Sequence, residues 1–437
     1  MQHKELKGSN SETSRWLTVV LFGTFVRVVF MVSGFHESFY RNVQVVSPVT
    51  SWFRVTECVA LASKQMSPYS GDICHHPPLV VQFFQALPAG YSFWFFLFCD
   101  ILTAMVLYTA AASYTSKQLS DQEKNKTKYA SDTAVLLLDE CKLRNVPLTV
   151  MAFYLVNPYT LVSCVAQSTV ILSNLVTAMV LLCMINGWFS LSCVFIAMSS
   201  YLSLYPIMLL VPVTIYACQK SSSITVPVIK CLTSLLLMLC GLFYTSYKMD
   251  GSWKFVYSVF GFILEAPDLT PNMGLFWYFF LEMFDHFSLF FLWVYQINAF
   301  IYTVPLAVIF RKQPMLICYA LISLMTLFKS YSTFGDLSLP IALLPLWSYT
   351  YRYMRNVLLI MAMLLFTSVL GPGMWHLWVY AGSGNSNFFY AVTLAYCTAQ
   401  IFLLSDVLYA HLRYEYHLCN GMSPKTSDGK EGTVVMK

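Results

Sequence analysis

Long apolar runs separated by short polar segments make up most of this chain of 437 residues. The runs lie at approximately 16–35, 91–112, 147–163, 166–185, 187–201, 203–218, 227–246, 288–310, 314–330, 336–350, 356–373 and 388–411. A helix of about 20 apolar residues crosses the hydrocarbon core of a bilayer, so we predict an all-α polytopic membrane protein with about 12 transmembrane helices and no fewer than about 10. Because some runs reach only about 15 residues, we expect a bundle in which several helices are interrupted.

Basic residues are concentrated in alternate segments between these runs. They precede the first run, fill the segment between the second and third, and recur in later alternate loops. The positive-inside rule makes that side cytosolic, with both termini on it and residues 36–90, 247–287, 331–335 and 374–387 on the lumenal side. The glycosylation motif at 125–127 then faces the cytosol, and we expect it to be unmodified.

The same pattern divides the chain into three parts. Residues 1–15 are polar and are expected to form a disordered cytosolic N-terminus. Residues 16–412 form a single multi-span membrane domain, and residues 413–437 form a polar cytosolic tail. Within the lumenal segments, 274–287 is predicted to be a short interfacial helix that precedes one span.

Composition supports the membrane assignment and adds little else. Apolar residues make up 57% of the chain and charged residues 11%, and the mean hydropathy is +0.61. Most of the 13 cysteines lie inside apolar runs and have no zinc or redox spacing. Cys58 and Cys74 share a long loop, where a disulfide is conceivable, but the sequence leaves that pairing open.

The segment MWHLWVYAGSGNSNFFY at 374–390 is a polar break between aromatic residues. Trp375 and Trp378 are typical of a bilayer–water interface, and amide-rich irregular backbone at such a depth needs protein or a water-filled cavity around it. The carboxamides of Asn385 and Asn387 suit sugar hydroxyls and phosphate oxygens. Alternatively, they form a turn in which Asn387 caps the following helix, and capping is compatible with ligand contact.

Other polar residues carry weaker predictions. Glu37, Glu57 and Asp72 stand singly in the first lumenal loop, without the paired carboxylates that a sugar-transfer reaction would use. His75 and its neighbour His76 could be metal ligands, but adjacent side chains in an extended loop point apart and no third ligand follows at a zinc spacing. The alternative is that they order a proline-terminated turn or meet a lipid phosphate.

Two charged groups lie elsewhere. Glu282, Asp285 and His286 are predicted to share one helical face, since 282 and 286 are four residues apart. We expect an interfacial salt-bridged turn rather than a metal site, with a subunit contact or a pocket wall as the functional alternative. Three basic residues, Lys220, Arg311 and Lys312, are predicted to lie on the cytosolic side. The positive-inside rule alone explains their positions, or they bind an anionic lipid headgroup.

Six segments resemble one known family, the phosphatidylinositol glycan class U subunits of the glycosylphosphatidylinositol (GPI) transamidase. They are VVSPVTSW (45–52), SPYSGDICHHPPL (67–79), NPYTLVSCVAQST (157–169), SLYP (203–206), PDLTPNMGLFWYFFLEMFDHFSLFF (267–291) and WHLWVYAGSGNSNFFYA (375–391). The resemblance implies a multi-pass subunit in the endoplasmic reticulum membrane. The complex cleaves a C-terminal signal from a proprotein and joins the new terminus to the ethanolamine of GPI.

By this resemblance, a caspase-like cysteine protease subunit does the chemistry, and the class U subunit presents the GPI lipid without being an enzyme. The residues matching Asn385 and Asn387 are implicated in GPI binding, and we add Trp375, Trp378 and His75 as candidate pocket residues. We expect no cofactor, no metal and no nucleic-acid partner, and we expect contacts with other transamidase subunits and membrane lipids.

The SPY block is also similar to that of the polytopic lipid-dependent mannosyltransferases, so the resemblance implies a bundle of that kind. The alternative function is therefore a dolichyl-phosphate-mannose-dependent glycosyltransferase of GPI biosynthesis. The chain lacks the D-x-D-type acidic motif of those enzymes in its first lumenal loop. A transporter would predict matching inverted halves, and none is evident in the sequence.

Overall fold

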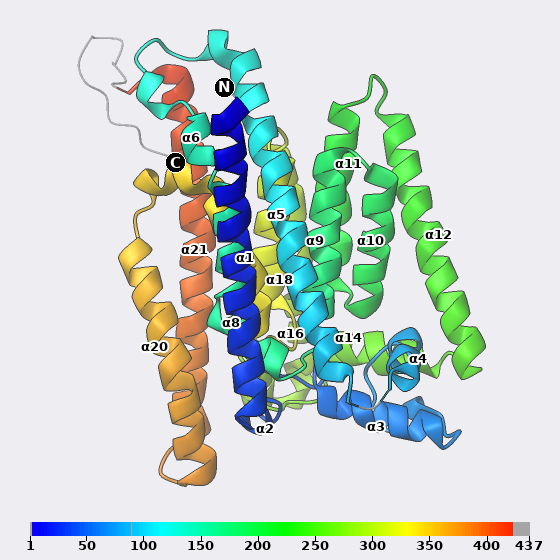
Figure 1. Cartoon of the computed structure of the whole chain (residues 1–437). Helices are drawn as coiled ribbons and strands as arrows, with labels where there is room; N and C mark the ends of the chain where they lie inside the picture. Colours follow the sequence, from blue (N-terminus) through cyan, green and yellow to red (C-terminus); the bar gives the residue numbers. More distant parts are fainter. Residues whose placement is uncertain (1, 89, 423–437) are drawn as a thin grey trace.

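The computed structural model describes the backbone of residues 2–88 and 90–422 and the side chains from residue 14 onward. Within that part of the chain, all regular elements are helices (Figure 1), as predicted. Residues 423–437, most of the predicted cytosolic tail, lie outside the described residues.

The long helices form the body of the bundle. They are α1 (Gln2–Val32), α5 (Ser92–Asn125), α9 (Val170–Asn186), α10 (Phe189–Leu202), α12 (Thr225–Asp250), α16 (Asp285–Ile301), α18 (Pro314–Phe328), α20 (Val357–Trp375) and α21 (Ser386–Asn420).

Shorter helices connect and cover them. They are α2 (His36–Phe39), α3 (Trp52–Ser63), η1 (Pro68–Ser70), α4 (Pro78–Ala86), η2 (Lys126–Lys128), η3 (Ala134–Leu136), α6 (Glu140–Leu143), α7 (Val146–Leu155), α8 (Pro158–Val165), η4 (Tyr205–Leu209), α11 (Leu210–Gln219), α13 (Lys254–Val256), η5 (Tyr257–Gly261), α14 (Phe262–Glu265), α15 (Phe276–Glu282), α17 (Thr303–Ile309), η6 (Phe334–Leu337), α19 (Ser338–Leu343), η7 (Leu344–Tyr353) and η8 (His376–Tyr380).

Helix length separates two groups of apolar helices. Among the described residues, six helical stretches are long and apolar enough to cross a membrane, in α1, α5, α12, α16 with α17, α20 with η8, and α21. The number is seven if α7 and α8, which are bent by 47° relative to each other, are counted as one span. The apolar helices α9, α10 and α18 have 17, 14 and 15 residues. At a rise of 1.5 Å per residue they are about 21–26 Å long, less than a hydrocarbon core of about 30 Å. The predicted span at 336–350 is divided between α19 and a 3₁₀ stretch, η7.

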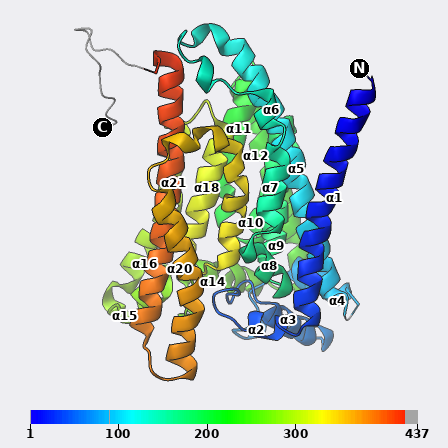
Figure 2. The same ribbon diagram turned by 60° about the vertical axis from the view of Figure 1, so that its left-hand side comes forward.

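The two ends of the bundle differ in content. The start of α1 and the end of α21 lie at one end, whereas α2, α3, α4 and α14 lie at the other (Figure 1). The turn between α20 and α21 and the short helix α15 also lie at that second end (Figure 2). The predicted lumenal segments that contain these elements therefore lie at the end of the bundle opposite the start of α1 and the end of α21.

A buried ion pair holds α1, α5 and the bend between α7 and α8 together. Arg27 and Asp100 are both fully buried, and the Arg27 Nε–H donates to Asp100 Oδ2 over 2.7 Å. The Arg27 Nη1 donates to the carbonyl of Leu155 over 2.8 Å, and its Nη2 to the Thr160 hydroxyl over 3.3 Å. Because α7 ends at Leu155, the guanidinium satisfies a carbonyl that the interrupted helix leaves free.

Candidate functional site

The segment 374–390 forms the turn that joins α20 to α21. After α20 the chain passes through the π-helical turn η8, and the backbone N–H groups of Ser383 and Gly384 both donate to the Leu377 carbonyl over 3.0 Å. Gly382 has a φ of +63°, in the left-handed region that favours glycine. A Cβ on Gly384 would come within 3.3 Å of the backbone of the preceding helical turn. The glycines therefore allow the turn to close tightly against η8.

The two asparagines stand side by side at the start of α21, and both are exposed. Asn385 is the N-cap of α21: its Oδ1 accepts the backbone N–H of Phe388 over 3.2 Å. The prediction that Asn387 is the cap was therefore wrong. Instead, the Asn387 Oδ1 accepts a hydrogen bond from the hydroxyl of Tyr278 in α15. The oxygen of each carboxamide is thus engaged within the protein.

An aromatic cluster packs against this turn. Trp375 and Trp378 are partly buried, and each packs on Phe389, with ring centroids 5.4 and 6.3 Å apart. Trp277 of α15 is 1% exposed and lies 6.3 Å from the Trp378 ring and 5.6 Å from Tyr390. The two predicted tryptophans are therefore part of the support of the turn, and their rings lie partly inside the cluster.

The cluster joins two segments that are about a hundred residues apart in the sequence. The Tyr278 ring stacks on Tyr390 at 4.5 Å, and the Tyr390 hydroxyl donates to the Leu275 carbonyl over 3.4 Å. Cys397 Sγ donates to the Met273 carbonyl over 3.6 Å. The blocks 267–291 and 375–391 thus form one structural unit, which we call the asparagine site.

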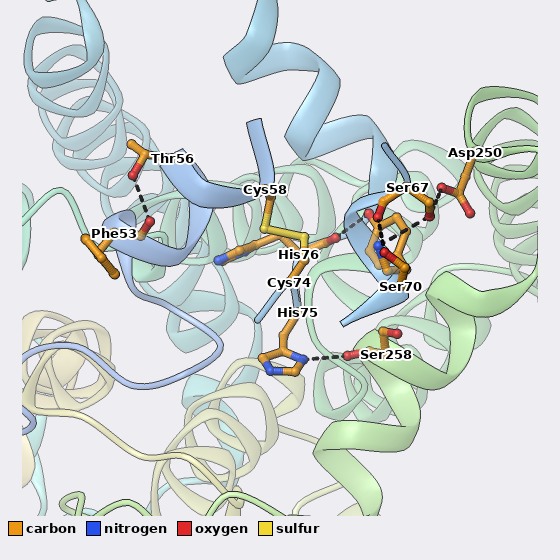
Figure 3. The surroundings of a disulfide bond; sticks show 11 residues. Phe53, Thr56, Cys58, Ser67, Ser70, Cys74, His75, His76, Asp250 and Ser258 are labelled. Atoms are coloured by element: carbon orange, nitrogen blue, oxygen red, sulfur yellow. Dashed lines mark hydrogen bonds between the residues drawn. A yellow bond between two sulfur atoms is a disulfide. The ribbon is translucent and has the colours of Figure 1, made fainter. Parts of the chain in front are cut away.

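A disulfide fixes the first predicted lumenal loop. Cys58 in α3 and Cys74 are bonded (Figure 3), which settles the pairing that the sequence left open. Disulfides persist in oxidising compartments such as the lumen of the endoplasmic reticulum. The bond therefore agrees with a lumenal position for this end of the bundle.

His75 and His76 follow the disulfide and are both buried. The His75 ring stacks on Phe262 at 3.5 Å, and its Nδ1 lies 2.8 Å from the Ser258 carbonyl (Figure 3). Burial lowers the pKa of His75, and it lowers the pKa of His76 to about 3, so both rings are neutral near neutral pH. The ring and hydrogen-bond partners of His75 belong to the segment 254–265, so the structure does not bring it to the asparagine site.

An ion pair ties the same loop to the block 267–291. The Arg54 Nη2 lies 2.8 Å from Asp268 Oδ2, and the Thr270 amide and hydroxyl donate to Asp268 Oδ1. Although burial opposes ionisation, the bonds from Thr270 and Arg54 hold the pKa of Asp268 below its ordinary value. The backbone N–H of Asp268 also donates to the Tyr331 hydroxyl over 3.2 Å. Three predicted lumenal segments are therefore linked into one platform.

The acidic candidates do not converge. α15 ends at Glu282 and α16 begins at Asp285, with extended backbone at Met283 between them, so Glu282, Asp285 and His286 do not share one helical face as we expected. Among the described residues, no three His, Cys, Asp or Glu side chains are grouped so that they could hold a metal ion. Glu37 and Asp72 are exposed, and Glu57 is partly buried.

The structure divides the three basic residues predicted at the cytosolic end. Arg311 and Lys312 line a large cavity between α11 and α21. Lys220 lies 4.9 Å from the ring of Tyr216 and lines a different recess with Phe189. Lys220 therefore lines a different recess from Arg311 and Lys312.

The sequence did not predict two side-chain pairs, Tyr278 with Asn387 and Arg27 with Asp100. Nothing in the sequence pairs Tyr278 with Asn387. Arg27 and Asp100 could have been found, because each is an isolated charge within a predicted apolar run and such charges have buried partners.

Comparisons with known proteins agree with the sequence resemblance. The family model "GPI transamidase subunit PIG-U" matches residues 21–396. The chain is 41% identical to the human protein named GPI-anchor transamidase component PIGU, over 96% of this chain and 98% of the human one. It is 42% identical to the mouse component over the same shares, and 32% identical to the GPI transamidase component GAB1 of Saccharomyces cerevisiae, over 86% and 89%. The chain therefore belongs to the PIG-U family of GPI transamidase subunits.

Proposed function

We propose that this chain is a non-catalytic subunit that binds the GPI lipid at the asparagine site and presents it for attachment to proprotein C-termini. The proposal rests on the exposure and the hydrogen bonding of the two asparagine carboxamides. Asn385 and Asn387 are exposed, and each already uses its oxygen as an acceptor. Among the described residues no hydrogen bond engages their NH₂ groups.

The exposed face of the site is therefore rich in donors. Two NH₂ groups offer up to four N–H donors, and phosphate and sugar oxygens are acceptors. Hydrogen bonds to a charged group contribute about 1.5–3 kcal/mol each, more than bonds between neutral groups. The phosphate-bearing headgroup of a GPI fits this donor set better than an ammonium group would.

We infer that the asparagine site faces the lumen of the endoplasmic reticulum. The disulfide supports an oxidising compartment for that end of the bundle, and the basic residues of the loops support a cytosolic position for the other end. The cluster of Trp and Tyr rings suits the bilayer–water interface. A lipid held there has its headgroup on the lumenal surface and its acyl chains among the helices.

The chemistry in this proposal belongs to another subunit. The relatives are named as components of the GPI transamidase, and the family is described as a transamidase subunit. We propose the caspase-like cysteine protease of that complex as the partner that forms the new bond. The assignment predicts that the purified chain makes no glycosidic product from a mannosyl-phospholipid donor, which separates it from the glycosyltransferase alternative.

The test is the double variant Asn385→Leu with Asn387→Leu, expressed in cells that lack the endogenous subunit. We expect the complex to assemble, as judged by co-purification of the partner subunits, while GPI-anchored protein at the cell surface falls sharply. Ser383→Ala, an exposed change in the same turn, is the matched control and should restore surface levels. Normal surface levels with the double Leu variant would refute the proposal.

Aspartate substitutions separate ligand binding from helix capping. Asp caps a helix as well as Asn does, so Asn385→Asp keeps the acceptor that α21 needs. It removes two donors and places a negative charge near the proposed phosphate. If Asn385 were only a cap, this variant would behave as wild type; we expect unchanged thermal stability and a marked loss of GPI attachment.

We further propose that about 12 helical segments lie in the bilayer, as in the mannosyltransferase-like bundle implied by the resemblance, with both termini cytosolic. The short helices α9, α10, α11 and α18 would then cross in a locally thinned or tilted arrangement. Single cysteines at Ser383 and Lys124 in a cysteine-depleted chain test the orientation. We expect a membrane-impermeant maleimide to label Lys124→Cys, but not Ser383→Cys, in sealed microsomes.

A further inference from the structure

A large polar cavity lies at the end of the bundle opposite the asparagine site. Its volume is about 1180 Å³, and it is lined by the end of α5, by α11, by the connection between α17 and α18, and by the end of α21. These ends lie at the same end of the molecule as the start of α1 (Figures 1 and 2). The cavity is thus separate from the site proposed for GPI.

Positive charge exceeds negative charge in this cavity. The basic lining residues are Lys117, Lys128, Arg311 and Lys312, and the acidic ones are Asp121 and Glu415. The Lys117 ammonium is already occupied, because it donates to the Tyr216 hydroxyl and lies 3.7 Å from that ring.

The acidic groups are engaged by other residues. Glu415 Oε1 accepts a hydrogen bond from Gln313 Nε2 over 3.2 Å and lies 3.4 Å from His411 Nε2. Asp121 Oδ1 lies 3.9 Å from the Lys124 ammonium.

The Lys128 ammonium donates to Asn125 Oδ1 over 2.9 Å, and the Lys312 charge acts on the Glu415 carboxylate without an ion-pair contact. Arg311 and Lys312 are therefore the basic lining residues whose side chains are available to a ligand. Within the part of the chain that the structure describes, no hydrogen bond or ion pair engages either side chain, and both are exposed. An arginine presents planar N–H donors that match phosphate oxygens in pairs, and the neighbouring lysine adds a second charge. The adjacent cations therefore suit one phosphate group.

The walls of the cavity suit an acyl chain. Ile224 and Val228, at the start of α12, line one side, and Ala307 and Val308 of α17 line another. Ile224 is 72% exposed and Val308 is 67% exposed. Both helices belong to candidate membrane spans that are only 17% buried inside the molecule, so this face of the cavity is apolar and exposed, as a surface in contact with a bilayer would be.

We propose that this cavity binds an anionic phospholipid of the cytosolic leaflet, with its headgroup phosphate on Arg311 and Lys312 and an acyl chain between α12 and α17. The charge of that leaflet favours basic residues near the membrane surface. The apolar walls favour a lipid over soluble phosphate. This site is independent of the GPI site, so either can fail while the other stands.

The experiment uses the purified transamidase complex in nanodiscs that contain photoreactive phosphatidylserine or, in a second set, photoreactive phosphatidylcholine. Crosslinked peptides are mapped by mass spectrometry. We expect phosphatidylserine to label residues 215–228 and 307–315 strongly and phosphatidylcholine weakly. Equal labelling by the two lipids would overturn the proposal.

Three variants test the contacts. Arg311→Gln with Lys312→Gln should lower phosphatidylserine labelling about thirtyfold, because each of the two basic residues near the surface contributes about 1 kcal/mol and about 1.4 kcal/mol is a factor of ten. The control, Lys126→Gln with Lys142→Gln, removes two exposed charges from the segment between α5 and α7 that do not line the cavity, and should change little.

The third variant, Ala307→Trp, fills the apolar wall without changing charge and should also lower labelling. It keeps the test decisive if the double Gln variant fails to assemble. Labelling unchanged by Ala307→Trp, labelling abolished by millimolar inorganic phosphate, or a partner peptide crosslinked in place of lipid would each overturn the assignment.

Discussion

Removing the carboxylate of Asp100 is expected to destabilise the bundle strongly, because Arg27 would keep its charge in a fully buried site. Both side chains are 0% exposed, and Asp100 is the only carboxylate paired with this guanidinium among the described residues. Arginine does not lose its proton in proteins, so Asp100→Leu leaves a buried cation. The reverse change, Arg27→Met, leaves a carboxylate that can take up a proton and become neutral.

The buried ion pair and the hydrogen bond to Leu155 set the expected change in the free energy of unfolding. Breaking a buried ion pair by removing one partner costs about 3–5 kcal/mol, so we expect about that cost for Asp100→Leu and less for Arg27→Met. The double variant removes both charges but also the donor to the Leu155 carbonyl, a loss that costs about 1–3 kcal/mol. It should therefore be more stable than Asp100→Leu alone.

The assay is the retention of the monodisperse peak in size-exclusion chromatography after heating, for the detergent-solubilised protein and its three variants. The order of stability should be wild type, then the double variant and Arg27→Met, with Asp100→Leu lowest. Steady-state amounts in cells should follow the same order. An Asp100→Leu protein as heat-resistant as wild type would refute the reasoning, and so would a double variant that loses the sum of the two single losses.

Three further predictions concern the end that we propose to be lumenal. Ser in place of Cys58 or Cys74 opens a loop closed by residues 16 apart and should cost about 3 kcal/mol, seen as an earlier thermal transition under non-reducing conditions; an unchanged transition would contradict the disulfide. Burial lowers the pKa of His76 from 6.5 to about 3. Between pH 6.5 and pH 3 the unfolded chain therefore binds more protons at His76 than the folded chain does, and the free energy of unfolding decreases as the pH falls below neutral. The loss should reach about 2 kcal/mol near pH 5, and His76→Gln should flatten the thermal stability profile between pH 5 and 7. Gly382→Val places a β-branched residue at a φ of +63° and should cost at least about 1–2 kcal/mol, read as faster proteolysis of the turn between α20 and α21; wild-type resistance would contradict the strained geometry.

The sequence predicted much of the asparagine site but not its internal arrangement. A polar break flanked by tryptophans was enough to predict a turn at this point of the chain, and its position at the bilayer interface stays a prediction. The identity of the cap was wrong, since both asparagines precede an apolar run and only backbone geometry distinguishes them. The extended conformation at Asn385 makes it the cap and leaves Asn387 free to meet Tyr278.

By itself, the sequence determined the all-helical membrane class, the family, and the separation of polar segments into two sets. The class and the separation depend on local composition and on alternation along the chain, and the family depends on the resemblance of six segments; none of these requires knowledge of packing. Only the tertiary structure decided which distant segments meet. It bonded Cys58 to Cys74, joined the block 267–291 to 375–391, and enclosed Arg27 with Asp100, while it separated Lys220 from Arg311 and Lys312. Such pairings depend on how the helices pack in three dimensions, and a one-dimensional pattern of apolar and polar residues does not contain that information.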